Sequence, residues 1–272
     1  MSNQGLPLLF HVLSHELRWQ LVSLLAQSDY RVHELVALVD RPTNLVSYHL
    51  GKLRTSRVVC ERRSSADGRD VYYSLDLNRL GSLFQEAGHE LHPSLWPETN
   101  FAQSMEDAGT QPPRVLFLCT RNSARSQMAE GLLRHIAGER VRVYSAGDLP
   151  SGVHPFAVQA MADMGIDISD QYAKHKDIFD GQSFDYVVTV CDFARENCPV
   201  FANEPAHIHW SIPDPVEERQ DASGVYEYST FVEVAKTLET RIHHLSARIA
   251  ANTRGHINQQ MAARVDPQGR KS

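Results

Sequence analysis

The sequence lacks long hydrophobic runs and has few cysteines. Its longest apolar pieces, such as residues 186–190, are far shorter than the roughly 18 residues that a helix needs to cross a bilayer. The first ten residues carry no basic segment of the kind that opens a secretion signal. Four cysteines in 272 residues are too few for a disulfide scaffold. We therefore expect a cytoplasmic protein with no membrane association, whose reduced cysteines serve either packing or chemistry.

The composition is that of an ordinary globular protein. With 42% hydrophobic and 22% charged residues, it falls outside the disordered, collagen-like and low-complexity classes. A single core usually stops growing at roughly 250 to 300 residues, so this length indicates two domains. The formal net charge of −6 argues against nucleic-acid binding over the whole chain, but a net charge averages over domains.

Hydrophobic periodicity divides the chain into two halves of different character. Before residue 92 it predicts short helices, a hairpin of residues 58–63 and 71–75, and a helix at 77–91. After residue 113, apolar strands alternate with helices, which predicts a three-layer α/β domain with a parallel sheet. The expected strands are 115–118, 141–144 and 186–190, and the expected helices are 126–136, 155–164, about 192–197 and about 230–250.

Four prolines and no sustained periodicity mark residues 93–113 as a linker. We therefore predict a mostly α-helical domain at 1–92 and an α/β domain at 114–251. Residues 252–272 are predicted to form a polar, frayed tail.

The strongest motif is a cysteine loop in the segment VLFLCTRNSARSQMAEGLL. An apolar strand ends at Cys119, five residues follow, and Arg125 stands where a helix begins. Such a loop turns backbone N–H groups inward, and the helix dipole adds positive character, so the site favours an oxyanion. Arg125 can hold two oxygens of a tetrahedral anion, and the same field favours the thiolate form of Cys119 as a nucleophile. The alternative is a buried structural cysteine with an incidental arginine.

A carboxylic acid is expected on the rim of such a site. When a phosphoryl group is attacked, its leaving oxygen must be protonated. Asp214 is a candidate, because Pro215 holds it in an extended or turn conformation. Taken alone, an Asp-Pro pair is more often part of an ordinary loop.

These residues together resemble the low-molecular-weight protein tyrosine phosphatase superfamily, and within it the thioredoxin-coupled arsenate reductases, over about residues 114–250. The family motif Cys-x5-Arg-Ser is met by Cys119, Arg125 and Ser126. The resemblance implies that Asn122, Ser123 and Ser126 support the oxyanion loop and that Asp214 lies in the family's late acidic loop. Residues 144–147 and the predicted helix that begins at Pro155 resemble the corresponding segments of the arsenate reductases more than those of the tyrosine phosphatases. Arg121 departs from the pattern, because many members have Gly there; it would either crowd the loop or add positive charge at its mouth.

A second cysteine pair discriminates further. Cys191 and Cys198 are separated by six residues, which matches the resolving cysteines of the reductases. The resemblance implies a relay: Cys119 attacks arsenate, Cys191 attacks the Cys119 adduct and releases arsenite, and a Cys191–Cys198 disulfide remains for thioredoxin or a small thiol to reduce. It implies no bound cofactor. The alternative is a loop with two structural cysteines.

The spacing of this pair also predicts a conformational change. Residues 192–197 are helix-prone, and a helix spans roughly 10 Å over seven residues, whereas a disulfide requires Cα atoms within about 7 Å. The segment must therefore unwind on oxidation.

A local basic stripe stands out in the N-terminal half. From Arg41 to Arg63 the sequence contains six basic residues and one acidic residue, Glu61. The stripe coincides with the third helix and the ascending strand of the hairpin, where a winged helix-turn-helix meets DNA. The predicted base contacts are Asn44, Ser47, Tyr48 and His49, and the predicted phosphate contacts are Lys52, Arg54, Arg62, Arg63 and Arg69. The alternative is a solvated, charged face of a small helical domain.

The segments PTNLVSYHLGKLRTSRVV and GRDVYYSLDLNRL look like the ArsR/SmtB family of winged-helix repressors, over about residues 8–91. This resemblance implies a homodimer that binds operator DNA and releases it on binding a metal or metalloid. The sequence departs where arsenic-sensing members carry a cysteine pair, since residues 29–35 contain none. Cys60 alone cannot form a three-coordinate soft-metal site, and His33 and Glu34 are better explained as surface residues, so we predict no metal site.

Three functions remain open at this stage. The first is an arsenate reductase joined to a transcriptional regulator. The second is a phosphatase for phosphotyrosine or small phosphomonoesters, with Asp214 as general acid. The third is a regulator whose second domain senses an oxyanion without turning it over.

Overall fold

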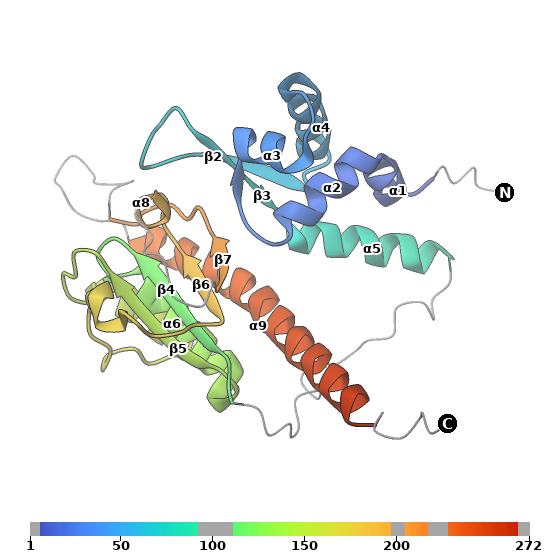
Figure 1. The fold of residues 1–272 in the computed structure, drawn as a ribbon. Coiled ribbons are helices and arrows are strands. Elements are labelled where there is room, and N and C mark those ends of the chain that lie inside the picture. The colour runs from blue at the N-terminus through green and yellow to red at the C-terminus, as the bar shows by residue number, and fades with distance from the viewer. Residues whose placement is uncertain (1–5, 92–110, 197–204, 217–227, 266–272) are drawn as a thin grey trace. The chain divides into compact units, whose positions relative to one another are not determined.

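The computed structural model describes residues 6–91, 111–196, 205–216 and 228–265, with side chains up to Thr253. These residues form two compact units (Figure 1). Unit 1 holds the described residues up to 91 together with 188–196 and 207–213, and unit 2 holds the others. Within the described ranges, no helix has the length and apolarity needed to cross a membrane. Most of the predicted linker lies outside the described residues, as does Cys198.

Unit 1 begins with helices that pack around a leucine- and valine-rich core. Its N-terminal elements are α1 (Leu8–Leu13), α2 (Glu16–Leu25), β1 (Tyr30–Arg31), α3 (Val32–Val39), α4 (Thr43–Thr55), β2 (Val59–Arg63), β3 (Val71–Leu75) and α5 (Leu77–Leu91). The three strands form an antiparallel sheet in the order β1-β3-β2. The predicted hairpin and the predicted helix at 77–91 are therefore present, and β1 is an element that the periodicity did not predict.

Helix α4 places its apolar residues on one face, and this corrects one prediction. Val46, Leu50 and Leu53 are fully or almost fully buried, at the helical spacing of three to four residues. His49 lies on the same face, is 3% exposed, and packs its ring 4.1 Å from that of His15. The prediction that His49 faces base edges is therefore wrong. Tyr48, by contrast, is 58% exposed.

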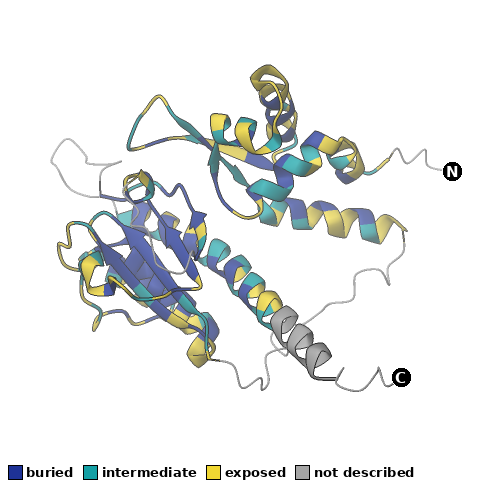
Figure 2. Cartoon of the chain, in the orientation of Figure 1, coloured by how far each residue is buried: buried dark blue, intermediate teal, exposed yellow. Residues whose placement is uncertain are grey.

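The remaining elements belong to an α/β fold. They are β4 (Arg114–Cys119), α6 (Arg125–Ala137), η3 (Gly138–Arg140), β5 (Arg142–Gly147), α7 (Pro155–Asp163), η4 (Lys176–Phe179), β6 (Tyr186–Thr189), α8 (Asp192–Glu196), β7 (Ala206–His209) and α9 (Tyr228–Val265). The sheet order is β5-β4-β6-β7, and β4 and β5 pair in parallel. Strand β4 is almost entirely buried (Figure 2). The predicted parallel-sheet α/β fold is confirmed.

Helix α9 is longer than predicted. The expected helix ends near residue 250, but α9 continues to Val265 through most of the stretch predicted as a frayed tail. Eight of the fifteen residues at 251–265 are Ala, Gln, Arg or Met, which have high helix propensity, so their polar composition did not exclude a helix. Strand β7 was also missed, because four residues are too few to show a strand period.

Candidate oxyanion site

Cys119 ends strand β4, and its thiol is held from two directions. The side chain is buried, with 4% of the residue exposed. The backbone N–H of Asn122 donates to Sγ at 3.1 Å, and the Ser126 hydroxyl lies 2.8 Å from Sγ. Both contacts stabilise a thiolate when the serine donates its hydrogen.

The neighbouring hydrogen bonds leave the Ser126 hydrogen available for Cys119. Asn122 Nδ2 donates to Ser126 Oγ at 2.9 Å and to Ser145 Oγ at 2.8 Å. Ser145 in turn donates to the buried carboxylate of Glu130 at 2.5 Å. Since Ser126 Oγ accepts from Asn122, its own hydrogen can be donated to Cys119 Sγ, which lies 2.8 Å away. Ser145 and Glu130 are therefore functional candidates that sequence reasoning missed.

Asn122 is the residue around which the loop is organised. Its φ is 46°, in the left-handed region that Asn tolerates better than most side chains. Its Oδ1 accepts from Gln127 Nε2 at 3.0 Å and from the backbone N–H of Lys174 at 2.7 Å. Asn122 thus ties the loop to α6 and to a distant segment of the chain.

Gly147 lets strand β5 approach the loop closely. In the β4–β5 register it stands opposite Cys119. A Cβ at this position would lie 2.6 Å from the carbonyl oxygen of Thr120 and 2.8 Å from the backbone nitrogen of Asn122. Any side chain here would therefore displace the backbone of the loop.

Arg125, at the first position of α6, meets the predicted acid. The residue is 5% exposed, and its Nη2 lies 2.5 Å from Asp214 Oδ2. The other carboxylate oxygen, Oδ1, accepts from the backbone N–H of Val216 at 3.0 Å. The structure thus brings together Cys119, Asn122, Ser126, Arg125 and Asp214 around one loop, and Ser123 within that loop is buried. Arg121 is exposed, so its side chain does not crowd the loop.

His154 is a further neighbour of the loop that sequence reasoning missed. Its backbone N–H donates to the Ser123 carbonyl at 2.8 Å, and its ring stacks on Phe231 with centroids 4.6 Å apart. Burial lowers the pKa of His154, although the nearby Asp214 carboxylate partly opposes this shift. The Pro155 that follows could have indicated this position as the N-cap of α7.

Cys191 lies in unit 1, two residues after the end of β6, and is 1% exposed. Its Sγ accepts a hydrogen bond from the backbone N–H of Ala194 at 3.4 Å, so the sulfur caps α8. The helix predicted at about 192–197 is confirmed as Asp192–Glu196. The predicted partner, Cys198, lies outside the described residues.

The residues predicted to bind DNA are mostly exposed on α4 and the hairpin, but several are already paired. Asn44, Ser47 and Lys52 are exposed. Arg54 forms an ion pair with Glu61 at 2.7 Å, Arg69 forms one with Asp67 at 2.7 Å, and Arg63 donates to the Gly68 carbonyl.

Arg62 requires a correction. It was predicted to suit a phosphate, but its Nη2 lies 2.6 Å from the fully buried carboxylate of Asp192, a residue that needs a cation. The Arg62 guanidinium is therefore already engaged by Asp192 and Ser211 and is not available for a phosphate.

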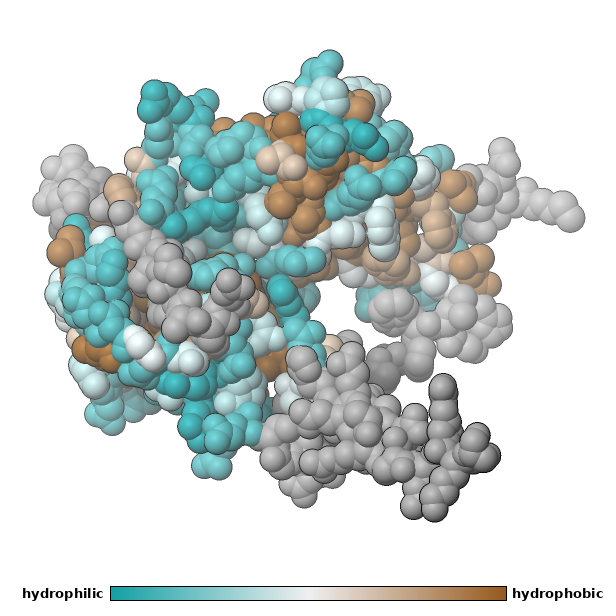
Figure 3. Space-filling view, in the orientation of Figure 1, coloured by the Kyte–Doolittle hydropathy of each residue, from teal (hydrophilic) through white to brown (hydrophobic). Residues whose placement is uncertain are grey.

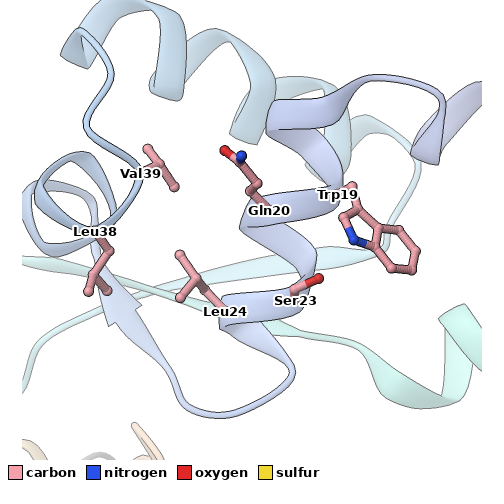
Figure 4. Close-up of a pocket in the computed structure, with 6 residues that line it drawn as sticks. All are labelled: Trp19, Gln20, Ser23, Leu24, Leu38 and Val39. Carbon is pink, nitrogen blue, oxygen red and sulfur yellow. The ribbon is translucent and has the colours of Figure 1, made fainter.

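A pocket between α2 and α3 lies apart from these groups (Figure 4). It is lined by Trp19, Gln20, Ser23, Leu24, Leu38 and Val39, none of which is ionisable. Apolar side chains gather on this face of unit 1 (Figure 3), where Trp19 and Leu38 are more than half exposed. Among the residues that the structure describes, no three His, Cys, Asp or Glu side chains are grouped so as to hold a metal ion.

The geometry defines a class of protein: a thiol at the end of a parallel strand, with an arginine at the start of the next helix, in a loop suited to a tetrahedral oxyanion. The family model described as low molecular weight phosphotyrosine protein phosphatase matches residues 114–255, and the chain belongs to this family.

Curated relatives show which branch of the family this is. The arsenate reductase of Staphylococcus xylosus is 38% identical over 134 residues, which cover 49% of this chain and 96% of the relative. The arsenate reductase of Shouchella clausii is 45% identical over 108 residues, 38% of this chain and 74% of the relative. The C-terminal half is thus a domain of the arsenate reductase type.

Two of the similar solved structures are also described as arsenate reductases. A structure described as an arsenate reductase in oxidized state shares 31% identity, covers 50% of this chain and 98% of its own, and has a TM-score of 0.44. The Corynebacterium glutamicum thioredoxin-dependent arsenate reductase shares 22% identity over 86% of this chain and 98% of its own, with a TM-score of 0.42.

Proposed function

We propose that this protein reduces arsenate to arsenite with a relay of three cysteines, Cys119, Cys191 and Cys198. The observation that carries the proposal is the second buried cysteine, Cys191, which a phosphatase does not need. Its support is the identity of 38% and 45% to arsenate reductases over the domain that carries the loop.

The first step is attack by Cys119 on arsenate. The Asn122 N–H and the Ser126 hydroxyl orient the attacking sulfur, and Arg125 binds two oxygens of the anion once Asp214 has released it. The As–S bond forms as one oxygen leaves as water, with Asp214 as the acid that supplies its proton. Arsenic stays in its +5 state in this step.

The second step transfers electrons. The Cys191 thiolate attacks Cys119 Sγ, an S–S bond forms, and the electron pair of the As–S bond stays on arsenic, which leaves as arsenite in the +3 state. Cys198 then attacks Cys191, releases Cys119 and leaves a Cys191–Cys198 disulfide. The two electrons lost by the thiols return from an external dithiol such as thioredoxin, or from a small thiol, so no bound cofactor is required.

An assay of arsenite formation with thioredoxin as reductant tests this proposal. Wild-type protein is expected to oxidise NADPH in an arsenate-dependent manner through thioredoxin reductase. Cys119→Ser, Cys191→Ser and Cys198→Ser should each abolish turnover, whereas Cys60→Ser, an exposed cysteine in unit 1, serves as the matched control and should retain it. Turnover that survives Cys191→Ser would contradict the relay.

Phosphomonoester hydrolysis is the second candidate, favoured by the contact between Arg125 and Asp214 and by the family name. It predicts hydrolysis of p-nitrophenyl phosphate that is lost in Cys119→Ser and falls in Asp214→Asn, but survives Cys191→Ser. Hydrolysis with no arsenate reduction would select this function.

We propose further that the N-terminal part of unit 1 is a winged helix-turn-helix that binds operator DNA as a homodimer. Its support is the order of α3, α4 and the β2–β3 hairpin, with Asn44, Ser47 and Tyr48 exposed on α4. With the arsenate reductase domain in the same chain, this makes a cytoplasmic enzyme tethered to a regulator.

A shift assay with the labelled DNA fragment that precedes the protein's own coding sequence tests this role. Asn44→Ala combined with Tyr48→Ala should weaken binding by about tenfold or more, since each good base contact is worth roughly 1–3 kcal/mol. Asn78→Ala, an exposed asparagine on α5, is the control. If neither enzymatic assay responds while DNA binding depends on arsenate or phosphate, the chain is an oxyanion sensor without turnover.

A further inference from the structure

A buried carboxylate ties the cysteine segment to the hairpin inside unit 1. Asp192, which follows Cys191 directly, is 0% exposed. Its Oδ2 accepts from Arg62 Nη2 at 2.6 Å and from the backbone N–H of Ser65 at 2.8 Å, and its Oδ1 accepts from the Ser211 hydroxyl at 2.8 Å. Burial of Asp192 opposes its ionisation, but these donors and His209 outweigh burial and hold its pKa below the ordinary range.

A second anchor joins the same short helix to the start of α3. Arg195, in α8, places Nη2 2.5 Å from Glu34 Oε1, and its Nη1 donates to the Asp29 carbonyl at 3.1 Å. Its guanidinium also lies over the Tyr72 ring of β3, 5.5 Å from the centroid. Helix α8 is therefore fixed at both ends to elements of the N-terminal part of unit 1.

The sulfur of Cys191 maintains this helix in the reduced protein. It accepts from the N–H of Ala194, and the Cys191 carbonyl accepts from the N–H of Arg195 at 3.2 Å. Drawing the sulfur into a disulfide removes the cap.

We propose that Cys191 is the sensing thiol of the N-terminal part of unit 1. Formation of a disulfide at Cys191 unwinds α8, withdraws Asp192 from Arg62 and Ser65, and withdraws Arg195 from Glu34, so that the hairpin turn and the start of α3 lose their anchors. Reduction by the external dithiol restores them. This inference rests on the proposed relay for its oxidant, which is arsenate, and it provides a response to arsenate in a segment that lacks the usual cysteine pair.

The amide of Ser65 gives a direct readout, because Asp192 is its acceptor. Amide hydrogen exchange of the full chain, followed by NMR, should show Ser65 exchanging about tenfold faster or more in the oxidised protein, as the loss of a hydrogen bond to a charged group predicts. The amide of Ser64 donates to the Asp70 carbonyl within the same turn and is the internal control.

Two adjacent arginines provide matched variants. Arg62→Gln removes the cation from Asp192 and should speed Ser65 exchange in the reduced protein, whereas Arg63→Gln, whose side chain donates to the Gly68 carbonyl, should not. Equal Ser65 exchange in reduced and oxidised wild type, with the Cys191 disulfide verified by mass, overturns the proposal.

A further variant separates this inference from the proposed enzyme activity. Cys119→Ser cannot attack arsenate, but diamide can still oxidise its Cys191 and Cys198 to a disulfide. Faster Ser65 exchange in this oxidised variant supports the sensing role, whether or not wild type forms arsenite. If wild type forms no arsenite, only the proposed reductase activity is contradicted. Unchanged Ser65 exchange in the oxidised variant overturns the sensing role even where wild type forms arsenite.

Discussion

Ser126 has a single hydroxyl hydrogen, and Cys119 Sγ lies within its reach. The Asn122 amide donates to the serine oxygen, while Ser145 and Glu130 hold the amide in place. The buried Glu130 carboxylate is two hydrogen bonds from the Asn122 amide and four from the Cys119 sulfur, and it supports the whole chain of contacts. The strength of Cys119 as a nucleophile thus depends on residues that never touch the anion.

Ser126→Ala should slow the alkylation of Cys119 by iodoacetamide at pH 7 by about tenfold, because a hydrogen bond to an ionised group is worth roughly 1.5–3 kcal/mol. The rate is followed by mass spectrometry of the Cys119 peptide. Ser169→Ala, an exposed serine in another loop, is the control. An alkylation rate equal to that of wild type would show that the hydroxyl does not stabilise the thiolate.

Prediction from the sequence succeeded where residues are neighbours along the chain. The strand, loop and helix pattern predicted that Cys119 and Arg125 lie close together because one loop joins them, and the family resemblance added Asn122. It could not locate Ser145 or Glu130, since these reach the loop through the β4–β5 pairing and the packing of α6. The burial of His49 was missed because histidine is polar and was therefore expected to face solvent. Its spacing from Val46 in fact places it on the buried face of α4.

At the scale of elements, the contact between β5 and the loop depends on the absence of a side chain at Gly147. The parallel register places this residue opposite Cys119, and the atoms that crowd it belong to backbone, which cannot rotate away. The position of the loop is therefore set by the sheet as well as by its own sequence.

Gly147→Ala should lower arsenate turnover by at least about tenfold, because overpacking of this kind typically costs 1–3 kcal/mol and here displaces the anion loop. Turnover and thermal unfolding are measured together. Gly81→Ala, in α5, meets no atom within 4 Å and is expected to leave turnover unchanged. Full turnover in Gly147→Ala would mean that the loop tolerates the shift.

Element lengths explain which elements the sequence predicted. The helix at 77–91 has both a helical stripe and clear ends, and it was predicted with the observed bounds. The two-residue β1 and four-residue β7 are shorter than the window in which a strand period becomes visible. The end of α9 was missed because the polar composition of residues 252–265 was taken as a sign of a frayed tail, whereas the helix continues to Val265.

At the scale of the whole molecule, buried histidines couple stability to pH. Burial lowers the pKa of His49, His154 and His209, with opposing contributions from Asp214 at His154 and from Asp192 and Asp29 at His209. The unfolded chain takes up protons near the ordinary histidine pKa of about 6.5, while the folded chain resists them. Stability is therefore present above about pH 6.5 and is lost as the pH falls below it.

Urea unfolding at pH 7.5 and pH 5.5 should give a lower free energy of unfolding at the lower pH. His209→Gln should reduce this difference, because one of the contributing groups is removed. His135→Gln, on the exposed face of α6, is the control and should behave as wild type. A free energy of unfolding that is the same at both pH values would contradict the assignment.

The contact between Arg125 and Asp214 has a consequence for anion selectivity. The Asp214 carboxylate neutralises the Arg125 guanidinium, so an anion that binds Arg125 must compete with this carboxylate. Chloride brings one charge on a single atom and cannot reproduce the paired oxygens of a carboxylate. A tetrahedral dianion brings a second charge and several oxygens at once. We therefore expect the ion pair to favour tetrahedral dianions over monatomic anions at this site.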